Sequence, residues 1–311
     1  MVNFFDKLYT SIKDKNKVLV RFRIYSIVRF LIRLFANIII PLYFRMTQSN
    51  KKYSLNATTT SKENITIASL TSFPARINKV WLVIETLLRQ THKPDKIILW
   101  LSKEQFPDLN TIPNNLLKLR TRGLDIRLCE DDLKSHKKYY YSFKEYPNDI
   151  IMTFDDDILY PSFITEKLMF YHNRFPNRIC CHRACIRSSK RYKDWKAAKS
   201  ENTEILNNLF FTTGGGTLFP PYSLYDDFLN EALFKKISFY ADDVWLNCMA
   251  ILKNSSVVKT DYFSVCLPVL NKSNFTLDSI NNGEESLNDK QISLLKEYYV
   301  QTLGINPFAV T

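Results

Sequence analysis

The chain has 311 residues, of which 45% are hydrophobic and 14% aromatic, and its formal net charge is +12. It is long and apolar enough to bury a substantial core, which excludes a wholly disordered protein, and six glycines are too few for a glycine-rich repeat protein. The charge is uneven, because residues 1–52 carry eleven Lys and Arg against two Asp, and eleven minus two is +9. A basic arm on a nearly neutral body favours an anionic membrane surface, and not nucleic acid, as a partner.

An arginine-rich helix is predicted for residues 18–44. Polar residues recur at every fourth position and form one stripe, which consists of Arg21, Tyr25, Arg29, Arg33 and Asn37. The longest uncharged run, residues 34–44, is eleven residues long, against the roughly twenty that a spanning helix needs. We expect an amphipathic helix that lies in the membrane interface, with packing on the protein's own core as the alternative. Pro41 is expected to end or kink this helix.

Strands alternate with helices from residue 65 onward. Short apolar runs predict strands at residues 65–70, 96–101, 124–128, 150–154 and 178–186. Apolar residues at helical spacing predict helices at residues 80–88, 163–175, 242–252 and 287–300. This alternation indicates an α/β fold with a mostly parallel sheet and helices on both faces. We divide the chain into a basic, amphipathic, membrane-associating arm (1–46), a linker (47–62), an α/β domain (63–270) and a helical tail (271–311).

The strand at residues 150–154 ends in three carboxylates, those of Asp155, Asp156 and Asp157. Ligands of open α/β sheets bind beyond the carboxyl ends of the strands. In an extended chain, Asp155 and Asp157 point to one side and Asp156 points to the other. Two carboxylates on one side suit a hard divalent cation such as Mg²⁺, which substrate phosphates also help to hold. The alternative is a solvated acidic turn.

Two later stretches also carry candidate site residues. Gly214, Gly215 and Gly216 stand together, which allows either close approach of backbone to a ligand or a plain tight turn. Asp242 and Asp243 open an apolar helix, where acids are common for capping and dipole reasons alone. The cysteines do not have the spacing of a disulfide framework or a usual zinc site, so a reducing cytoplasm is expected.

In their order along the chain, these motifs resemble bacterial polysaccharide-biosynthesis glycosyltransferases of the GT-A fold, a family 2-like group that contains a DXD motif. The resemblance spans about residues 65–266 and rests on Ile65–Arg76, Gln90–Leu101, Lys137–Tyr141, Pro147–Pro161 and the TTGGG and ADDVW runs. It implies a Rossmann-like GT-A domain and inverting, metal-dependent transfer from a nucleotide-sugar, with a UDP-sugar favoured. The acceptor would be a glycan or lipid-linked glycan in capsule, lipopolysaccharide or other surface polysaccharide synthesis. The implied location is peripheral, on the cytoplasmic face of the bacterial cell membrane.

The resemblance also implies roles for the donor-binding residues. Asp155 and Asp157 match the DXD motif and would hold Mn²⁺ or Mg²⁺ on the donor diphosphate, with Asp156 near the ribose or sugar. Lys138 is a candidate contact to the diphosphate, and Lys137 is its rival. The nucleotide would lie against residues at and beyond the end of the first strand, namely Ser69, Leu70, Thr71 and Arg76.

For the acceptor side, the resemblance places the acidic catalytic base at Asp242, with Asp243 in reserve. The loop of Gly214, Gly215 and Gly216 would wall the sugar or acceptor pocket. Trp245 would stack on an acceptor sugar or pack in the core.

The chain departs from the family at one point. Many such enzymes complete the metal site with a histidine near the C-terminus, whereas all histidines here precede the glycine loop, namely His92, His136, His172 and His182. Water, a backbone oxygen or a carboxylate such as Asp261 would have to replace it.

Two other functions stay open at this point. A metal-dependent nucleotidyltransferase would normally carry a glycine-rich basic loop after the first strand, where this chain has Ser-Leu-Thr-Ser-Phe-Pro. A non-catalytic, membrane-associated glycan-binding scaffold would not need two intact acidic motifs.

Overall fold

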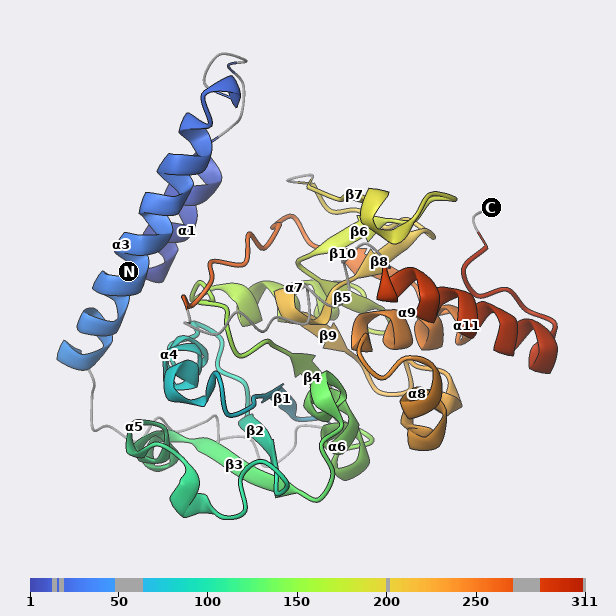
Figure 1. Cartoon of the computed structure of the whole chain (residues 1–311), viewed down its shortest axis with the longest axis horizontal. Helices are drawn as coiled ribbons and strands as arrows, with labels where there is room; N and C mark the ends of the chain where they lie inside the picture. Colours follow the sequence, from blue (N-terminus) through green and yellow to red (C-terminus); the bar gives the residue numbers. More distant parts are fainter. Residues whose placement is uncertain (13–15, 17–19, 48–63, 200–201, 271–285, 310–311) are drawn as a thin grey trace.

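The computed structural model describes the chain except residues 13–15, 17–19, 48–63, 200–201, 271–285 and 310–311 (Figure 1). Its centre is a seven-stranded sheet with the order β10-β5-β9-β4-β1-β2-β3. The strands are β1 (Thr66–Thr71), β2 (Lys96–Ser102), β3 (Leu124–Cys129), β4 (Ile150–Thr153), β5 (Ile179–Cys181), β9 (Thr217–Phe219) and β10 (Val257–Lys259). Neighbouring strands are parallel except where β9 pairs with β4 and β5. The mostly parallel α/β sheet predicted from the sequence is confirmed.

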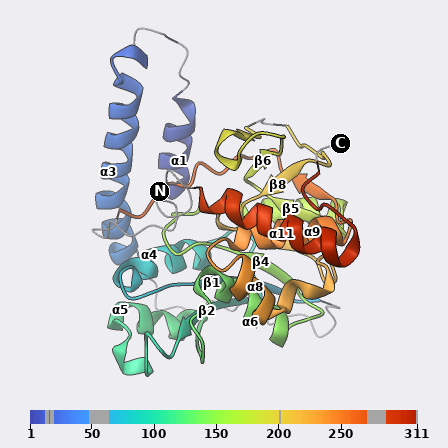
Figure 2. The same ribbon diagram turned by 45° about the vertical axis from the view of Figure 1, so that its right-hand side comes forward.

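Helices cover both faces of this sheet (Figures 1 and 2). One face contacts α4 (Ile77–Leu88), α5 (Asn114–Leu117) and α7 (Ile164–Arg174). The other contacts α6 (Lys137–Glu145), α8 (Glu231–Ile237), α9 (Asp242–Leu252) and α11 (Leu287–Leu303). Along β2, Leu99 enters the first core, and its neighbours Ile98 and Trp100 enter the second. Because both faces are buried, the strands read as continuous apolar runs.

A second sheet lies beside the first and was not predicted. It is antiparallel, with the order β7-β6-β8, and consists of β6 (Ala184–Ile186), β7 (Lys196–Ala197) and β8 (Leu209–Phe211). The single strand predicted for residues 178–186 is therefore wrong, since it divides into β5 and β6 of different sheets. The break falls at His182, whose buried ring lies between the Thr260 hydroxyl at 2.7 Å and the Ile164 carbonyl at 3.0 Å.

The N-terminal arm consists of α1 (Val2–Ser11) and α3 (Ile24–Met46), which lie side by side along the flank of the molecule (Figures 1 and 2). Of the two effects expected of Pro41, an end of the helix is wrong, because α3 continues to Met46 with Pro41 inside it. Its last turn is held because Phe44 is buried and the Arg89 guanidinium lies 4.6 Å from the Phe44 ring centroid. Apart from Thr47, the predicted linker lies outside the described residues.

Candidate active site

Three carboxylates cluster where β4 ends, at the carboxyl edge of the sheet. Arg76 Nη1 lies 2.7 Å from Asp156 Oδ1 and 2.8 Å from Asp157 Oδ2. Lys138 Nζ lies 2.7 Å from Asp155 Oδ1. The expected alternation, with Asp156 apart from the other two, is wrong because β4 ends at Thr153 and residues 156–157 form a turn. Asp156 and Asp157 instead share one guanidinium, whereas Asp155 pairs with the Lys138 ammonium.

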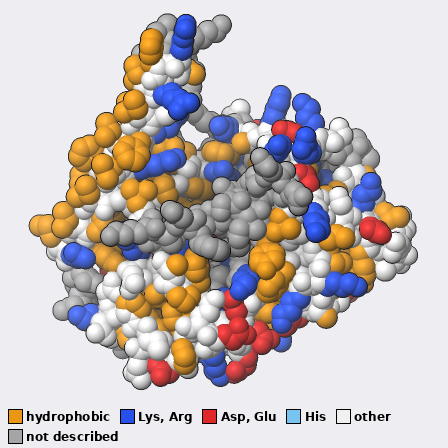
Figure 3. Space-filling view, in the orientation of Figure 1, with side chains coloured by type: hydrophobic (Ala, Val, Ile, Leu, Met, Phe, Trp, Pro, Cys, Tyr) orange, Lys and Arg blue, Asp and Glu red, His pale blue; other side chains and the backbone are white. Residues whose placement is uncertain are grey.

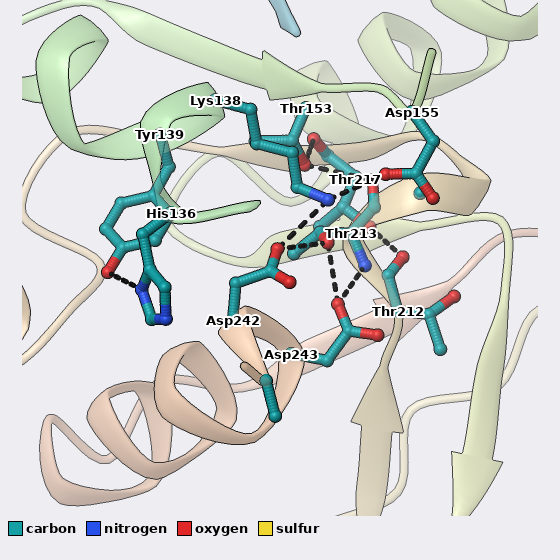
Figure 4. Close-up of polar contacts among 12 residues, drawn as sticks. His136, Lys138, Tyr139, Thr153, Asp155, Thr212, Thr213, Thr217, Asp242 and Asp243 are labelled. Carbon is teal, nitrogen blue, oxygen red and sulfur yellow. Dashed lines mark hydrogen bonds and ion pairs between the residues drawn. The ribbon is translucent and has the colours of Figure 1, made fainter. Parts of the chain in front are cut away.

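The second acidic motif reaches the same place from the N-terminus of α9 (Figure 4). Lys138 Nζ is 3.0 Å from Asp242 Oδ2, so one buried ammonium joins Asp242 to Asp155. Thr213 donates its N–H to Asp243 Oδ1 at 2.8 Å, and its hydroxyl lies 2.6 Å from the same oxygen and 2.9 Å from Asp242 Oδ2. Two motifs far apart in the sequence therefore form a single cluster.

The two carboxylates on α9 differ in their protonation chemistry. Burial raises the pKa of Asp242, but the charges of Lys138 and His136 outweigh it and lower the pKa to about 2. Burial and then the charge of Asp242 raise the pKa of Asp243 to about 7, although Lys138 and the Thr213 hydrogen bonds oppose this. Asp242 is buried, whereas Asp243 is half-buried. Asp243 is therefore the carboxylate that can take up a proton near neutral pH.

The site carries more negative than positive charge. Two cations, Arg76 and Lys138, face five carboxylates, namely Asp155, Asp156, Asp157, Asp242 and Asp243. Burial and the charge of Asp155 raise the pKa of Asp157 to about 7. Such crowding of carboxylates favours a divalent cation, and a donor set of oxygens suits Mn²⁺ or Mg²⁺.

Among the described residues, no group of three or more His, Cys, Asp and Glu side chains has the arrangement of a complete metal site. Asp261, the candidate third ligand, pairs with Lys167 at 2.8 and 2.9 Å. Burial lowers the pKa of both His136 and His182 to about 4, and their rings are hydrogen-bonded elsewhere. Two carboxylates completed by phosphate oxygens and water match the usual pattern for Mg²⁺.

The donor-binding residues predicted on β1 divide into buried and accessible ones. Ser69 is fully buried with its hydroxyl 2.7 Å from that of Ser142, and Leu70 is fully buried in the core. Their side chains are therefore part of the core, because β1 is a central strand with both faces covered, and their place beside a nucleotide stays a prediction. Thr71 is half-buried at the strand end, where its hydroxyl donates to the Trp100 carbonyl at 2.8 Å.

The two adjacent lysines have different partners. Lys137 is buried in an ion pair with Asp132, so its ammonium is directed away from the acidic cluster. Lys138 contacts both acidic motifs, as described above. Lys138 is thus the lysine that reaches the acidic cluster, and its contact to a diphosphate stays a prediction.

The glycine loop contacts the acidic turn through one of its three glycines. A Cβ atom on Gly214 would lie 1.8 Å from Asp155 Oδ2, so only glycine fits at this position. A Cβ on Gly215 would instead meet Arg183, and one on Gly216 would meet His182. Gly216 also has a φ of +94°. The latter two glycines shape the loop and do not adjoin the carboxylates.

Trp245 does not line the site. It is fully buried, its indole N–H donates to the Phe228 carbonyl at 3.1 Å, and its ring lies edge-on to Phe234. The predicted stacking on an acceptor sugar is therefore wrong, and the alternative of core packing is confirmed.

Sequence reasoning missed residues that hold the cluster together. The Tyr160 hydroxyl accepts the Asp155 N–H at 2.8 Å and donates to the Gly214 carbonyl at 2.6 Å, which joins the acidic turn to the glycine loop. Ser72 donates its hydroxyl to Asp156 Oδ2 at 2.5 Å. Ser72 lies within the TSFPAR run that carried the family resemblance, so a signal was present. Tyr160 and Thr213 also lie within such runs, Pro147–Pro161 and TTGGG, but no role was assigned to them.

A segment that we call the strap, residues 266–270, links the acidic turn to the arm. The Val269 N–H donates to the Asp157 carbonyl at 2.7 Å. On α3, the Asn37 amide donates to the Pro268 carbonyl at 2.8 Å and accepts the Leu270 N–H at 2.7 Å. The arm is therefore connected to the acidic turn by hydrogen bonds through the backbone of the strap.

No family model matches the chain, and no curated protein matches it. Among solved structures, it is similar to the mannosyltransferase PcManGT from Pyrobaculum calidifontis in complex with GDP-Man and Mn²⁺, with 11% sequence identity and a TM-score of 0.42. The alignment covers 88% of this chain and 75% of that one. These values are too low to transfer the reaction or the ligands of that protein to this chain.

Proposed function

We propose that this protein is an inverting, metal-dependent glycosyltransferase that moves a sugar from a nucleotide-sugar to a hydroxyl group of a glycan or lipid-linked glycan. Capsule, lipopolysaccharide or another surface polysaccharide is the proposed product. One observation carries the proposal, namely that Lys138 joins the acidic turn after β4 to the acidic start of α9. The acidic turn suits a metal ion on a donor diphosphate, and the start of α9 would supply a base for the acceptor hydroxyl.

On the donor side, Asp155 and Asp157 are the residues proposed to hold Mn²⁺ or Mg²⁺. Bound there, the cation would neutralise charge on the departing nucleoside diphosphate. Burial opposes the charge of Lys138, but Asp155 and Asp242 outweigh it and raise its pKa above the ordinary value, so the ammonium stays protonated. Its two carboxylate contacts use two of its three donors, which would leave one for a phosphate oxygen.

On the acceptor side, the two environments favour Asp243 as the base and Asp242 as its neighbour of fixed charge, which reverses the order proposed from sequence. Asp243 would accept the proton of the acceptor hydroxyl while the hydroxyl oxygen forms its bond to the anomeric carbon. The bond from that carbon to the diphosphate breaks on the opposite face, and the diphosphate leaves with the electron pair. One displacement of this kind inverts the anomeric centre.

A thermal-shift screen of UDP-, GDP-, dTDP- and CMP-sugars, each with Mn²⁺ or with EDTA, tests the donor half of the proposal, with UDP-sugars first. A ligand that binds only the native state raises its stability by about 2.7 kcal/mol at a hundredfold excess over Kd. We expect a Mn²⁺-dependent shift for one nucleotide class and, with that donor, release of the nucleoside diphosphate in the presence of acceptor. A Mn²⁺-dependent shift with free nucleoside triphosphates alone would instead support a nucleotidyltransferase.

A further inference from the structure

The arm turns its polar side toward the protein. On α3, Arg33 donates to the Tyr9 hydroxyl at 2.5 Å and Arg29 donates to the Ile12 carbonyl at 3.0 Å, which ties α3 to α1 and the residue after it. Asn37 holds the strap, as described above. The inward side is completed by buried apolar residues one turn apart, namely Ile32, Ala36, Ile40 and Phe44. Three residues of the predicted polar stripe, Arg29, Arg33 and Asn37, therefore face inward, where their groups have partners.

The opposite side of α3 is apolar and exposed. Ile27 is 54% exposed, Phe30 57% and Ile38 51%. Neighbouring apolar side chains on the same face are also exposed. More of the exposed large apolar side chains lie on α3 than on any other described element. Figure 3 shows this surface as a continuous orange stripe along the arm. A helix in water normally has the reverse arrangement, with its apolar face toward the core.

Positive charge stands at both ends of this apolar face. Arg21 and Arg23 precede α3 and are exposed, and Arg45 is exposed in its last turn. An apolar stripe bordered by arginine matches the boundary of an anionic bilayer, where the stripe enters the acyl region and the guanidinium groups reach the phosphates. We propose that the outward face of α3 docks on an acidic phospholipid surface, with the helix lying in the plane of the interface.

The packing of α3 decides between lying in the interface and crossing it. Among the described residues, α3 is the helix that is long and apolar enough to span a membrane. However, α1 covers its inner side near the N-terminal end, and α1 exposes the charged Lys7, which hydrocarbon would not solvate. Nearer its C-terminus, α3 rests on the strap and the helical layer of the main sheet. Lipid can therefore reach one side of α3 only.

The same features argue against a second copy of the chain as the occupant of this face. In a self-association through α3, the arginines at the ends of the two helices would be brought together and would repel one another. An acidic lipid surface neutralises them, at a gain of roughly fivefold in affinity for each basic side chain near the membrane.

The test is co-sedimentation of the full chain with preformed vesicles of phosphatidylcholine, with and without phosphatidylglycerol. We expect binding that increases with phosphatidylglycerol and decreases with salt. In a double variant, Leu31→Glu with Ile38→Glu, the partition constant should fall by at least about tenfold, because two outward apolar contacts are lost. Leu294→Glu is the matched control, since Leu294 is an exposed leucine on α11, far from the arm in sequence.

Equal thermal midpoints of the wild type and both variants would show that the change in partition is not a folding defect. The proposal is overturned if the wild type stays in the supernatant with acidic vesicles, or if the double variant pellets as the wild type does. It is also overturned if the wild type forms a dimer that the double variant loses and neither binds vesicles. Vesicle binding does not depend on catalysis, so these outcomes are independent of the proposed function.

Discussion

Lys138 Nζ lies 3.0 Å from Asp242 Oδ2, and this ion pair makes Asp242 chemically different from the residue beside it. An ammonium at that distance favours the ionised carboxylate, so Asp242 stays charged over the whole physiological range. Burial raises the pKa of Asp243, and the charge of Asp242 raises it further. Asp242, whose charge is constant, thus increases the basicity of Asp243, which takes up and releases a proton.

The first prediction concerns the identity of the base. Asp243→Asn should lower kcat by about a thousandfold, the usual contribution of a general base, and should leave the Mn²⁺-dependent thermal shift by the donor intact. Asp242→Asn should retain more turnover, because it alters the charge around the base and leaves the base present. Steady-state kinetics with the donor found in the screen provides the measurement. Near-normal turnover of Asp243→Asn together with an inactive Asp242→Asn would restore the assignment made from sequence.

The second prediction concerns pH. A base works in its ionised form, so kcat/KM should rise with pH until Asp243 is deprotonated, with an inflection near its pKa of about 7. In Asp242→Asn the like charge that raises this pKa is removed, and the inflection should move to lower pH. The profiles should be recorded at saturating Mn²⁺, so that proton competition at Asp157 does not contribute. An inflection that stays in place or moves upward would contradict the coupling.

The third prediction concerns the metal ligands. Asp157→Ala should abolish both turnover and the Mn²⁺-dependent donor shift, because one of the two proposed ligands is lost. Asp261→Asn is the matched control, since Asp261 pairs with Lys167 and should keep both properties. Titration of Mn²⁺ monitored by the donor-dependent thermal shift distinguishes the two variants. A weakened titration in Asp261→Asn would identify Asp261 as the missing third ligand.

The fourth prediction concerns the glycine loop. Gly214→Ala would place a methyl group 1.8 Å from the present position of Asp155 Oδ2, so the carboxylate must move. We expect loss of turnover and of the Mn²⁺-dependent donor shift. Gly304→Ala is the control, because that glycine follows α11 at a φ of +69° with open space around it. It should lower the thermal midpoint and leave activity unchanged. Normal donor binding by Gly214→Ala would show that Asp155 is not a ligand.

Strands β1 to β4 and helices α4, α7, α9 and α11 were predictable, because apolar runs and helical spacing are patterns that residue order alone displays. Strands β9 and β10 of the same sheet were not predicted. The same patterns could not separate β5 from β6, since the break depends on where the ring of His182 finds its partners. The two acidic motifs were also predictable. Their relation to each other was not, because it is made by Lys138 and Thr213, which neither motif contains.

Two orientations could not be predicted from residue type. The sequence left Trp245 open between stacking on a sugar and packing in the core, and the spacing of Arg29, Arg33 and Asn37 predicted one polar stripe without the direction that it faces. Trp245 instead fills the space between α8 and α9 and the turn before them, where its N–H has a backbone partner. The polar stripe instead meets α1 and the strap. In both cases a partner from a distant part of the chain decided the orientation.

The strap has a practical consequence for shortening the chain. Deletion of residues 1–46 is the obvious way to obtain a more soluble protein, and it would remove the apolar face of α3. It would also take Asn37 away from the Pro268 carbonyl and the Leu270 N–H, on either side of the Val269 N–H that supports Asp157. Each backbone group left without a partner costs about 1–3 kcal/mol where it stays buried. A shortened protein that is inactive would therefore be ambiguous, and point substitutions on the outer face are the safer route to a soluble enzyme.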